Sequence, residues 1–381
     1  MKRPALLAAL SLLLSLPSLP AAETLVYIGT YTRGDGGSEG IYVSRLDPET
    51  GRLSAPELAA ATTNPSFLDI HPSGTHLYAV SEVPEHEGQP GGAVTAFRVD
   101  PASGRLQALN ARSSQGGGPC HISVDPSGRC VVVANYGGGS TTSFPLAADG
   151  SLLPAGSHIQ HTGSSVNPRR QKEPHAHSAN ISADSRHAFV ADLGIDQVLI
   201  YRLDPAAGTL APHGSAKIAP GSGPRHFALH PSGKWAWVIN ELTLTLTGFA
   251  WNNEAGTLTE IQTIGTIPDA DRNREGLSTA EVRVHPSGQF VYGSNRGHDT
   301  IAVFRVDPAT GQLSLVEIEP IQGKTPRNFN IDPSGRWLLA AGQGSNSVSV
   351  FRIDPATGAL EFTGQKIEVG TPVCIRFIAR P

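Results

Sequence analysis

Basic, acidic and imidazole side chains stand at matching places of a repeated turn pattern. A turn of the form His/Asp-Pro-Ser-Gly recurs at intervals of 47 to 57 residues, starting at His71, Asp125, His230, His285 and Asp332, with a degenerate copy at Ser182. Five or four residues before these starts stand the charged and imidazole residues His121, His177, Arg225, His226, Glu281 and Arg327. A third matching place, at the end of the next apolar run of each repeat, holds the polar residues Tyr31, Glu82, Tyr136, Glu241, Arg296 and Gln343.

These residue types suit acid–base chemistry on a substrate that carries or develops negative charge. An imidazole transfers protons near neutral pH, a carboxylate can act as a base, and a guanidinium fork binds carboxylates, phosphates and oxyanions. Charged groups at buried positions are costly unless they are paired or functional. The pattern therefore has two interpretations: a functional site, or a ring of salt bridges that holds neighbouring repeats together.

Each repeat has the same internal order, which predicts four short strands. A short run such as GPRHFAL precedes the Pro-Ser-Gly turn, and an apolar run such as KWAWVIN follows it. Next come a β-branched and aromatic run such as TIAVFRV, an Asp-Pro-x-x-Gly turn and a short last segment. No segment has a convincing helical period, and Pro and Gly at fixed offsets set the turns. Four-stranded units repeated around an axis predict an all-β protein, a β-propeller.

The two ends of the chain indicate that there are seven repeats. The segment TLVYIGTY near the start matches a second strand, whereas GTPVCIRFIARP at the end matches a first strand. We therefore predict that one sheet contains both ends, with the strand near 26–30 pairing with the strand near 373–378. This arrangement closes the ring and leaves no free edge. The expected fold is a seven-bladed β-propeller.

The first strand of such a sheet lies nearest the axis, so the matched positions of all repeats surround one central mouth. The candidate site residues at this mouth are Glu82, His121, Tyr136, His177, Arg225, His226, Glu241, Arg296 and Arg327. Three insertions, at 83–92, 157–174 and 268–279, are expected to overhang the same mouth. Two of them carry the basic residues Arg169, Arg170, Lys172, Arg272 and Arg274, which either form a rim for an anionic ligand or are solvated loop charges.

The motifs of several other chemistries are absent from the sequence. There is no HExxH and no Walker loop, and neither a GxSxG elbow nor a GxGxxG stands between a strand and a helix. His175 and His177 could bind a metal, but no clear carboxylate cluster accompanies them, and we predict no metal site. The turn histidines His71, His230 and His285 alternate with Asp and are expected to cap turns on the opposite face.

The composition excludes further classes of protein. The chain has 29 Lys and Arg against 33 Asp and Glu, which argues against broad nucleic-acid binding. Its 39 % hydrophobic content argues against intrinsic disorder. The cysteines Cys120, Cys130 and Cys374 are odd in number and form no CxxC pair, so we interpret them as buried thiols with at most one disulfide.

The first residues have the features of a secretory signal peptide. Lys2 and Arg3 precede a 12-residue apolar run, Ala5–Leu16, and the small residues Ala21 and Ala22 follow it. We predict a signal peptide over 1–22 and one domain over 23–381, in the periplasm or secreted, with no membrane association after cleavage. An uncleaved anchor is the alternative.

With these motifs, the sequence resembles the seven-bladed propeller lactonase family, which includes the propeller-type 6-phosphogluconolactonases and the fungal carboxymuconate-lactonizing enzymes. The resemblance covers essentially the whole mature chain and is carried by LVYIGTYT, EPHAHSANIS, GPRHFALHPSGKWAWVINEL and GSNRGHDTIAVF. It implies a lactonase that needs no metal or organic cofactor. The catalytic residues that it implies are His177 in HAHS, Arg225 in GPRH, Glu241 in NEL and Arg296 in SNRG.

The expected reaction is attack of water on the carbonyl carbon of a sugar lactone, such as 6-phosphogluconolactone. Glu241 or His177 would act as the base, and two arginines would hold the oxyanion or an anionic substituent. Since nearby positive charge keeps a carboxylate ionised, we predict that Glu241 is a weak base and that His177 is the better candidate. The export signal leaves open whether the substrate is phosphorylated. Two alternatives are a cycloisomerase that closes a lactone from an unsaturated acid and a non-catalytic exported propeller that binds a sugar or a protein.

Overall fold

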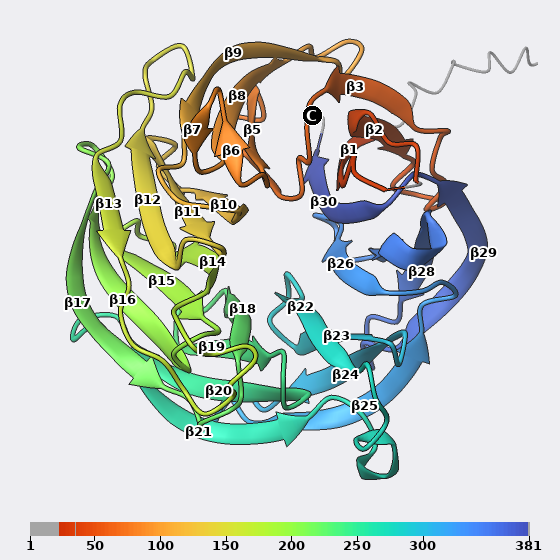
Figure 1. The fold of residues 1–381 in the computed structure, drawn as a ribbon. Coiled ribbons are helices and arrows are strands. Elements are labelled where there is room, and N and C mark those ends of the chain that lie inside the picture. The colour runs from red at the N-terminus through yellow and green to blue at the C-terminus, as the bar shows by residue number, and fades with distance from the viewer. Residues whose placement is uncertain (1–22, 35, 380–381) are drawn as a thin grey trace, which may run out of the picture.

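The computed structural model describes residues 23–34 and 36–379. Seven four-stranded antiparallel sheets stand around a central axis as the blades of a propeller (Figure 1). The predicted seven-bladed β-propeller is therefore confirmed. The predicted signal peptide, residues 1–22, lies outside the described residues. Within the described ranges, no helix has the length and apolar character needed to cross a membrane.

The blades follow one another along the chain, and in each of them the strands are ordered from the innermost to the outermost. The first three are β4 (Leu68–Ile70), β5 (His76–Ser81), β8 (Ala93–Val99), β9 (Leu106–Ser113); β10 (Pro119–Val124), β11 (Cys130–Asn135), β12 (Ser140–Pro145), β13 (Ser157–Gln160); and β14 (Ala176–Ile181), β15 (His187–Asp192), β16 (Gln197–Asp204), β17 (Thr209–Lys217). The next three are β18 (Pro224–Leu229), β19 (Trp235–Asn240), β20 (Thr245–Asn252), β21 (Thr257–Gly265); β22 (Ser278–Val284), β23 (Phe290–Arg296), β24 (Thr300–Val306), β25 (Leu313–Pro320); and β26 (Pro326–Ile331), β27 (Trp337–Gly342), β28 (Ser347–Ile353), β29 (Leu360–Glu368). The last is β30 (Pro372–Ile378), β1 (Thr24–Thr30), β2 (Gly40–Leu46) and β3 (Glu57–Ala61). The remaining elements are the hairpin of β6 (Glu85–His86) and β7 (Gln89–Pro90) and the 3-10 helices η1 (Asp269–Asp271) and η2 (Gln343–Ser345).

The last of these blades joins the two ends of the chain, as predicted. β1 and β30 pair in antiparallel register, from Leu25 opposite Ile378 to Gly29 opposite Cys374. Both strands lie side by side in Figure 1, although one begins and the other ends the described chain. The pairing completes the seventh sheet and so closes the ring.

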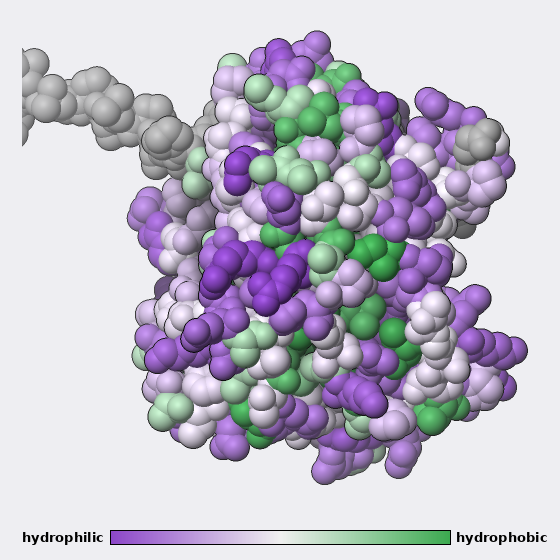
Figure 2. Space-filling view, turned by 90° about the vertical axis from the view of Figure 1, so that its left-hand side faces the viewer, coloured by the Kyte–Doolittle hydropathy of each residue, from purple (hydrophilic) through white to green (hydrophobic). Residues whose placement is uncertain are grey.

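Burial is greatest in the second strands and least in the outermost strands, and the sequence pattern follows it. Every residue of β11, β15 and β27 is buried, because these second strands pack against neighbouring blades on both faces, which explains their continuous apolar runs. The outermost strands β9 and β21 contain no fully buried residue. Figure 2 shows the resulting outer side of the ring, where hydrophobic areas are small and lie between hydrophilic ones.

Hydrogen bonds from the second strands tie blades together. Tyrosine hydroxyls donate to glycine carbonyls in the third turn of the next blade, at Tyr27 to Gly104 (2.8 Å), Tyr78 to Gly150 (2.9 Å) and Tyr292 to Gly358 (2.8 Å). These glycines have positive φ, as the turn geometry demands. The outer turns are therefore anchored to the buried strands of a neighbour.

The turn histidines cap their own turns and also reach the next blade. The Nδ1 atom of His71 lies 2.7 Å from Ser73 Oγ, and its Nε2 atom lies 2.9 Å from the carbonyl oxygen of Gly128. His230 and His285 repeat both contacts, the second to Gly288 and Gly335. The prediction of turn caps is confirmed. The three cysteines are buried free thiols, also as predicted.

Candidate active site

The innermost strands contain an irregularity that turns two consecutive residues toward the axis. In β10, β14, β18 and β26, the pairing with the second strand shifts within the first three residues, for example between Pro224 and His226 of β18. β22 shows a similar shift, between Thr279 and Val282. Side chains of a regular strand alternate between its two faces, whereas a β-bulge re-aims one of them. The bulge explains how Arg225 and His226, adjacent in sequence, both reach the central channel.

A cavity of about 420 Å³ opens at the mouth where the innermost strands begin. It is lined by Tyr31, Arg33, Glu82, Cys120, Tyr136, Arg170, His177, Glu241, Ser278, Arg296, Arg327 and Gln343. Six of the nine candidate site residues are among them: Glu82, Tyr136, His177, Glu241, Arg296 and Arg327. The repeat pattern thus placed most of the candidates at one mouth.

The other three candidates lie below this cavity. Arg225 is fully buried and donates from its Nε to Glu241. His121 and His226 are buried deeper in the channel, where the His121 ring stacks on Phe67 with ring centroids 3.9 Å apart. His226 packs edge-on against both rings, at 5.2 Å from His121 and 5.6 Å from Phe67. Phe67, His121 and His226 form the floor of the cavity, and we call these three rings the aromatic plug.

Glu241 follows β19 and accepts contacts from three guanidinium groups. Its carboxylate oxygens lie 2.6 Å from Arg170 Nη2, 2.9 Å from Arg296 Nη2 and 3.0 Å from Arg225 Nε. Burial alone would raise the pKa of Glu241, but the arginines outweigh it and hold the pKa well below the ordinary 4.5. The carboxylate is therefore ionised and a very weak base, as the sequence predicted.

His177 faces Glu241 across the cavity floor. Its Nε2 atom lies 3.9 Å from Glu241 Oε2, too far for a direct hydrogen bond, and its Nδ1 atom lies 3.7 Å from the Cys120 sulfur. Burial, reinforced by the charge of Arg225, lowers the pKa of His177 well below 6.5. The imidazole is thus neutral at neutral pH and can accept a proton. Burial raises the pKa of Cys120, so this residue is a neutral thiol and not a nucleophile.

The opposite wall of the cavity has a second charged group. The Tyr31 hydroxyl donates to Glu82 at 2.8 Å, and Arg33 lies 3.4 Å from the same carboxylate. Burial raises the pKa of Tyr31 to about 12, so the hydroxyl keeps its proton. The guanidinium of Arg327 lies 5.4 Å from the centre of the Tyr31 ring. Among the described residues, the Arg327 side chain has no carboxylate partner and no hydrogen bond.

The cavity carries an excess of positive charge. Five guanidinium groups face or underlie it, at Arg33, Arg170, Arg225, Arg296 and Arg327, against the two carboxylates Glu82 and Glu241. Burial and neighbouring arginines lower the pKa of Arg225 to about 9, which leaves it charged at neutral pH. Because His177 is neutral, the positive charges at the site exceed the negative charges by three. An anionic ligand would offset this excess.

Only one of the predicted basic loop residues belongs to the site. The insertion at 157–174 brings Arg170 over the cavity, where it also donates to the Tyr136 hydroxyl at 3.1 Å. Arg169 and Lys172 of the same loop are exposed to solvent. Arg272 and Arg274 pair with the aspartates of their own loop, Asp269 and Asp271, at 3.0 and 3.8 Å. The basic rim expected from the sequence is therefore reduced to one arginine.

A buried network holds the HAHS segment in place. His161 Nδ1 lies 2.7 Å from Asp192 Oδ2, and the other oxygen of Asp192 accepts the backbone N–H of His175 at 2.7 Å. The His175 ring stacks on Tyr136 with centroids 4.6 Å apart. No group of three His, Cys, Asp or Glu within the described ranges is placed to hold a metal ion. His175 serves as a packing partner of the site.

Sequence reasoning did not name Tyr31 or Arg33 as candidate site residues, and it named Arg170 only as part of a basic rim. Tyr31 stands at the matched end of a second strand, so the repeat pattern contained the signal for it. Arg33 and Arg170 stand in segments outside the repeat, so no matched position could indicate them. Their role depends on loop conformations that bring them to Glu82 and Glu241.

Comparisons with known proteins agree with this geometry. Residues 25–377 match the family model described as lactonase, 7-bladed beta-propeller. The chain is 39 % identical to a 6-phosphogluconolactonase of Bacillus subtilis over 353 residues, covering 92 % of this chain and 97 % of the relative. It is 33 % identical to a 6-phosphogluconolactonase of Formosa agariphila over 309 residues, which is 80 % of this chain and 85 % of that one.

A solved structure of a similar protein has the same fold. The periplasmic gluconolactonase of Pseudomonas aeruginosa is 36 % identical, with a TM-score of 0.87, and the match covers 94 % of this chain and 100 % of that chain. The family match covers nearly the whole described chain, and the residues that line the cavity lie within it. This chain belongs to the seven-bladed β-propeller lactonase family.

Proposed function

We propose that this protein hydrolyses an anionic sugar lactone of the 6-phosphogluconolactone type to the open acid. The observation that carries the proposal is the cationic cavity in which a neutral imidazole and an ionised carboxylate face an arginine without a carboxylate partner. Relatives named as 6-phosphogluconolactonases and a gluconolactonase support the lactone ring as the reacting group. The charge excess supports a negatively charged substituent on the sugar.

In the proposed reaction, His177 is the general base. Its neutral imidazole takes a proton from water while the water oxygen bonds to the lactone carbonyl carbon. The negative charge that develops on the carbonyl oxygen is stabilised by Arg296 and Arg170, which already face the cavity. The bond to the ring oxygen then breaks, and the imidazolium returns its proton to that oxygen. The acid so formed releases its own proton to water.

Glu241 supports His177 by charge and does not remove the proton itself. Its carboxylate is ionised and lies 3.9 Å from Nε2, so it stabilises the imidazolium as it forms. Three arginine contacts hold the carboxylate in position. We also propose that Arg327, with Tyr31 and Arg33 beside it, binds the anionic substituent, because its donors are not used within the protein.

We further propose that the protein is exported to the periplasm. The predicted signal peptide over 1–22 and the periplasmic relative from Pseudomonas aeruginosa support this location. Mature protein isolated from the periplasmic fraction should begin near residue 22 or 23, as measured by intact mass spectrometry.

The decisive experiment compares two lactones that differ in one group. Rates with 6-phosphoglucono-1,5-lactone and glucono-1,5-lactone are measured with the spontaneous hydrolysis subtracted. We expect a higher kcat/KM for the phosphorylated lactone, and we expect Arg327→Gln to reduce this preference by about tenfold or more. An equal loss for both lactones would show that Arg327 does not bind the substituent.

The matched control is Arg105→Gln, which changes an exposed arginine in an outer turn far from the cavity. It should leave both rates unchanged. Formation of a lactone from an unsaturated acid would instead identify a cycloisomerase. Lactone binding without turnover would identify a binding protein.

A further inference from the structure

The opposite end of the channel has a polar ring of its own. Each innermost strand has one more inward position near its C-terminal end, and six of these seven positions are polar: Asp69, Ser123, Asn180, Arg283, Asn330 and Arg376. The seventh is Ala228. Two adjoining cavities, of about 470 and 280 Å³, are lined by these seven residues and share Asp69 as a common wall. We call the two together the turn-side mouth.

The turn-side mouth is separate from the candidate active site. The aromatic plug of Phe67, His121 and His226 lies between the two ends of the channel. Arg376 packs against the turn side of this plug, with its guanidinium 4.6 Å from the centre of the Phe67 ring. No residue lines both the active-site cavity and the turn-side mouth.

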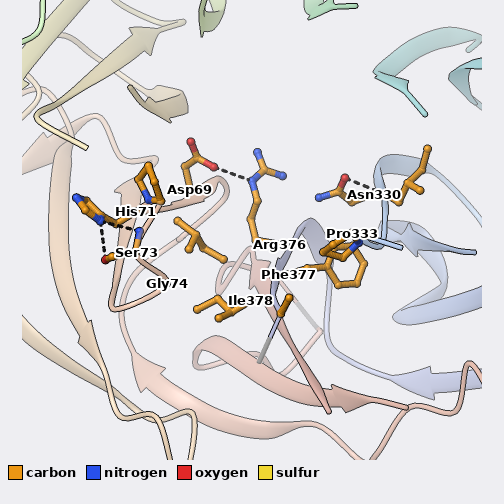
Figure 3. Close-up of a pocket in the computed structure, with 13 residues that line it drawn as sticks. Asp69, His71, Ser73, Gly74, Asn330, Pro333, Arg376, Phe377 and Ile378 are labelled. Carbon is orange, nitrogen blue, oxygen red and sulfur yellow. Dashed lines mark hydrogen bonds and ion pairs between the residues drawn. The ribbon is translucent and has the colours of Figure 1, made fainter. Parts of the chain in front are cut away.

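Two arginines of the turn-side mouth have donors that the protein does not use. Arg376 stands between Asp69 and Asn330 (Figure 3), and its Nε donates to Asp69 at 3.2 Å. Its Nη1 donates to the backbone oxygen of Ile375, and among the described residues its Nη2 has no acceptor. Arg283 contacts Glu281 through Nη2 alone, at 3.4 Å, and its buried Nε has no partner. Both side chains remain partly accessible, with 27 % of the Arg283 side chain and 9 % of the Arg376 side chain exposed, so an anionic group in the mouth can reach them.

The carboxylates nearby restrict which anion fits. Asp69 accepts from Arg376 and from the backbone N–H of Val124, and its side chain remains a quarter exposed. Glu281 is buried and balances Arg283. The mouth therefore has no net charge excess, and a doubly charged phosphate would face Asp69 without compensation. A single carboxylate can take the free guanidinium donors, while hydroxyl groups can donate to Asp69 and to the amide oxygen of Asn180.

We propose that the turn-side mouth is a second binding site, for a small hydroxylated monocarboxylate such as an open-chain sugar acid. The carboxylate binds between Arg283 and Arg376, and the hydroxyl groups bind the polar ring. The proposal does not rest on lactone hydrolysis at the other mouth, because it concerns binding alone.

The test is a methyl NMR titration of isoleucine-labelled protein with D-gluconate. Ile70, Ile331 and Ile378 line the larger cavity, and their signals should shift in a saturable manner. D-Glucitol, the matched polyol without a carboxylate, should cause no saturable shift. Inorganic phosphate should bind about tenfold more weakly or less. Phosphate binding as tight as that of gluconate, or no saturable shift with gluconate, would overturn the proposal.

Two variants assign the binding to the arginines. Arg283→Gln should weaken D-gluconate binding by about tenfold or more, and Arg376→Lys should also weaken it, because an ammonium cannot replace the planar fork. Lys234→Gln, which removes an exposed charge from a turn on the same face, is the control and should bind as the wild type does. Unchanged binding in both arginine variants, with a melting temperature like that of the wild type, would contradict the proposed site.

Discussion

In the proposed reaction, His177 and Glu241 divide the work of a general base between them. The imidazole supplies the lone pair, since burial and Arg225 keep it neutral. The carboxylate supplies a fixed negative charge, since three arginines keep it ionised. A carboxylate so strongly stabilised cannot take a proton efficiently, but it favours the imidazolium that forms beside it. The pKa shifts of the two groups therefore point to different roles.

The first prediction concerns the pH dependence of kcat/KM. The base must be unprotonated, so the rate should be flat near neutral pH and should fall only in acid, below 6.5, as His177 protonates. Glu241→Gln removes a charge that raises the pKa of His177, so the fall should move to lower pH. His177→Asn should lower kcat by roughly 10²–10⁴-fold. Initial rates over the pH range measure all three, and a wild-type fall centred at or above pH 6.5 would contradict the assignment.

The second prediction separates catalysis from a purely structural ion-pair ring. Arg225 is fully buried and Arg296 faces the cavity, although both contact Glu241. Arg225→Ala should lower the free energy of unfolding by about 3 kcal/mol or more, because it opens a cavity and removes one partner of a buried charge. Arg296→Ala should change stability less and weaken binding of an anionic lactone more. Denaturant unfolding and KM values test this pair; equal stability losses with unchanged lactone hydrolysis would favour the structural ring.

The matched positions of the repeat predicted most of the site because every blade presents the same positions to the axis. The matched positions could not predict how deep in the channel each side chain lies. His121 and His226 occupy positions like those of the other candidates, yet they form the plug, since neighbouring large rings fill the channel below the cavity. They could not predict Arg170 either, because its loop has no counterpart in the other blades. Its place depends on contacts such as that of Asn167 Oδ1 with the backbone N–H of Arg170.

β30 closes the ring, because it completes the blade that the N-terminal strands begin. It contributes the buried residues Val373, Cys374 and Ile375 and one edge of the pairing with β1. The sequence could predict this pairing, since the N-terminal segment lacks a first strand and the C-terminal segment lacks a second. It could not predict the bulges of the innermost strands, because no residue type marks where their pairing shifts.

The third prediction concerns this closing strand. Ending the chain after Thr371 removes β30, leaves the inner edge of β1 unpaired and leaves the last blade with three strands. We expect a large loss of stability and a loss of cooperative unfolding, measured by denaturant titration. A chain that ends after Ala379 keeps all of β30 and is the control. Unchanged cooperative unfolding of the shorter chain would show that the closure is not needed.

For the molecule as a whole, the channel encloses ionisable groups and largely removes them from bulk water. His121, His177 and His226 are all buried there, and burial is the main cause that lowers each pKa well below 6.5. Glu281 lies 3.0 Å from His226 Nδ1 and favours its protonation, but burial and the arginines around the channel outweigh it. Repeat spacing alone could not indicate these shifts, since they arise only when seven blades enclose the same space.

The last prediction follows from these three histidines. A lowered folded-state pKa means that the native protein binds fewer protons than the unfolded chain once the pH falls below 6.5. The stability that depends on the neutral imidazoles is thus complete above pH 6.5 and is lost as the pH falls from there toward the folded-state pKa values. As the pH falls, three such groups together can lower the free energy of unfolding by about 4 kcal/mol per pH unit. Calorimetry should show a melting temperature that drops steeply between pH 7 and pH 5. The drop should be shallower for His121→Gln, because the unfolded chain of this variant takes up one proton fewer over that range. A melting temperature that does not change over this range would mean that the channel histidines bind as many protons in the native state as in the unfolded chain, which would contradict their lowered pKa values.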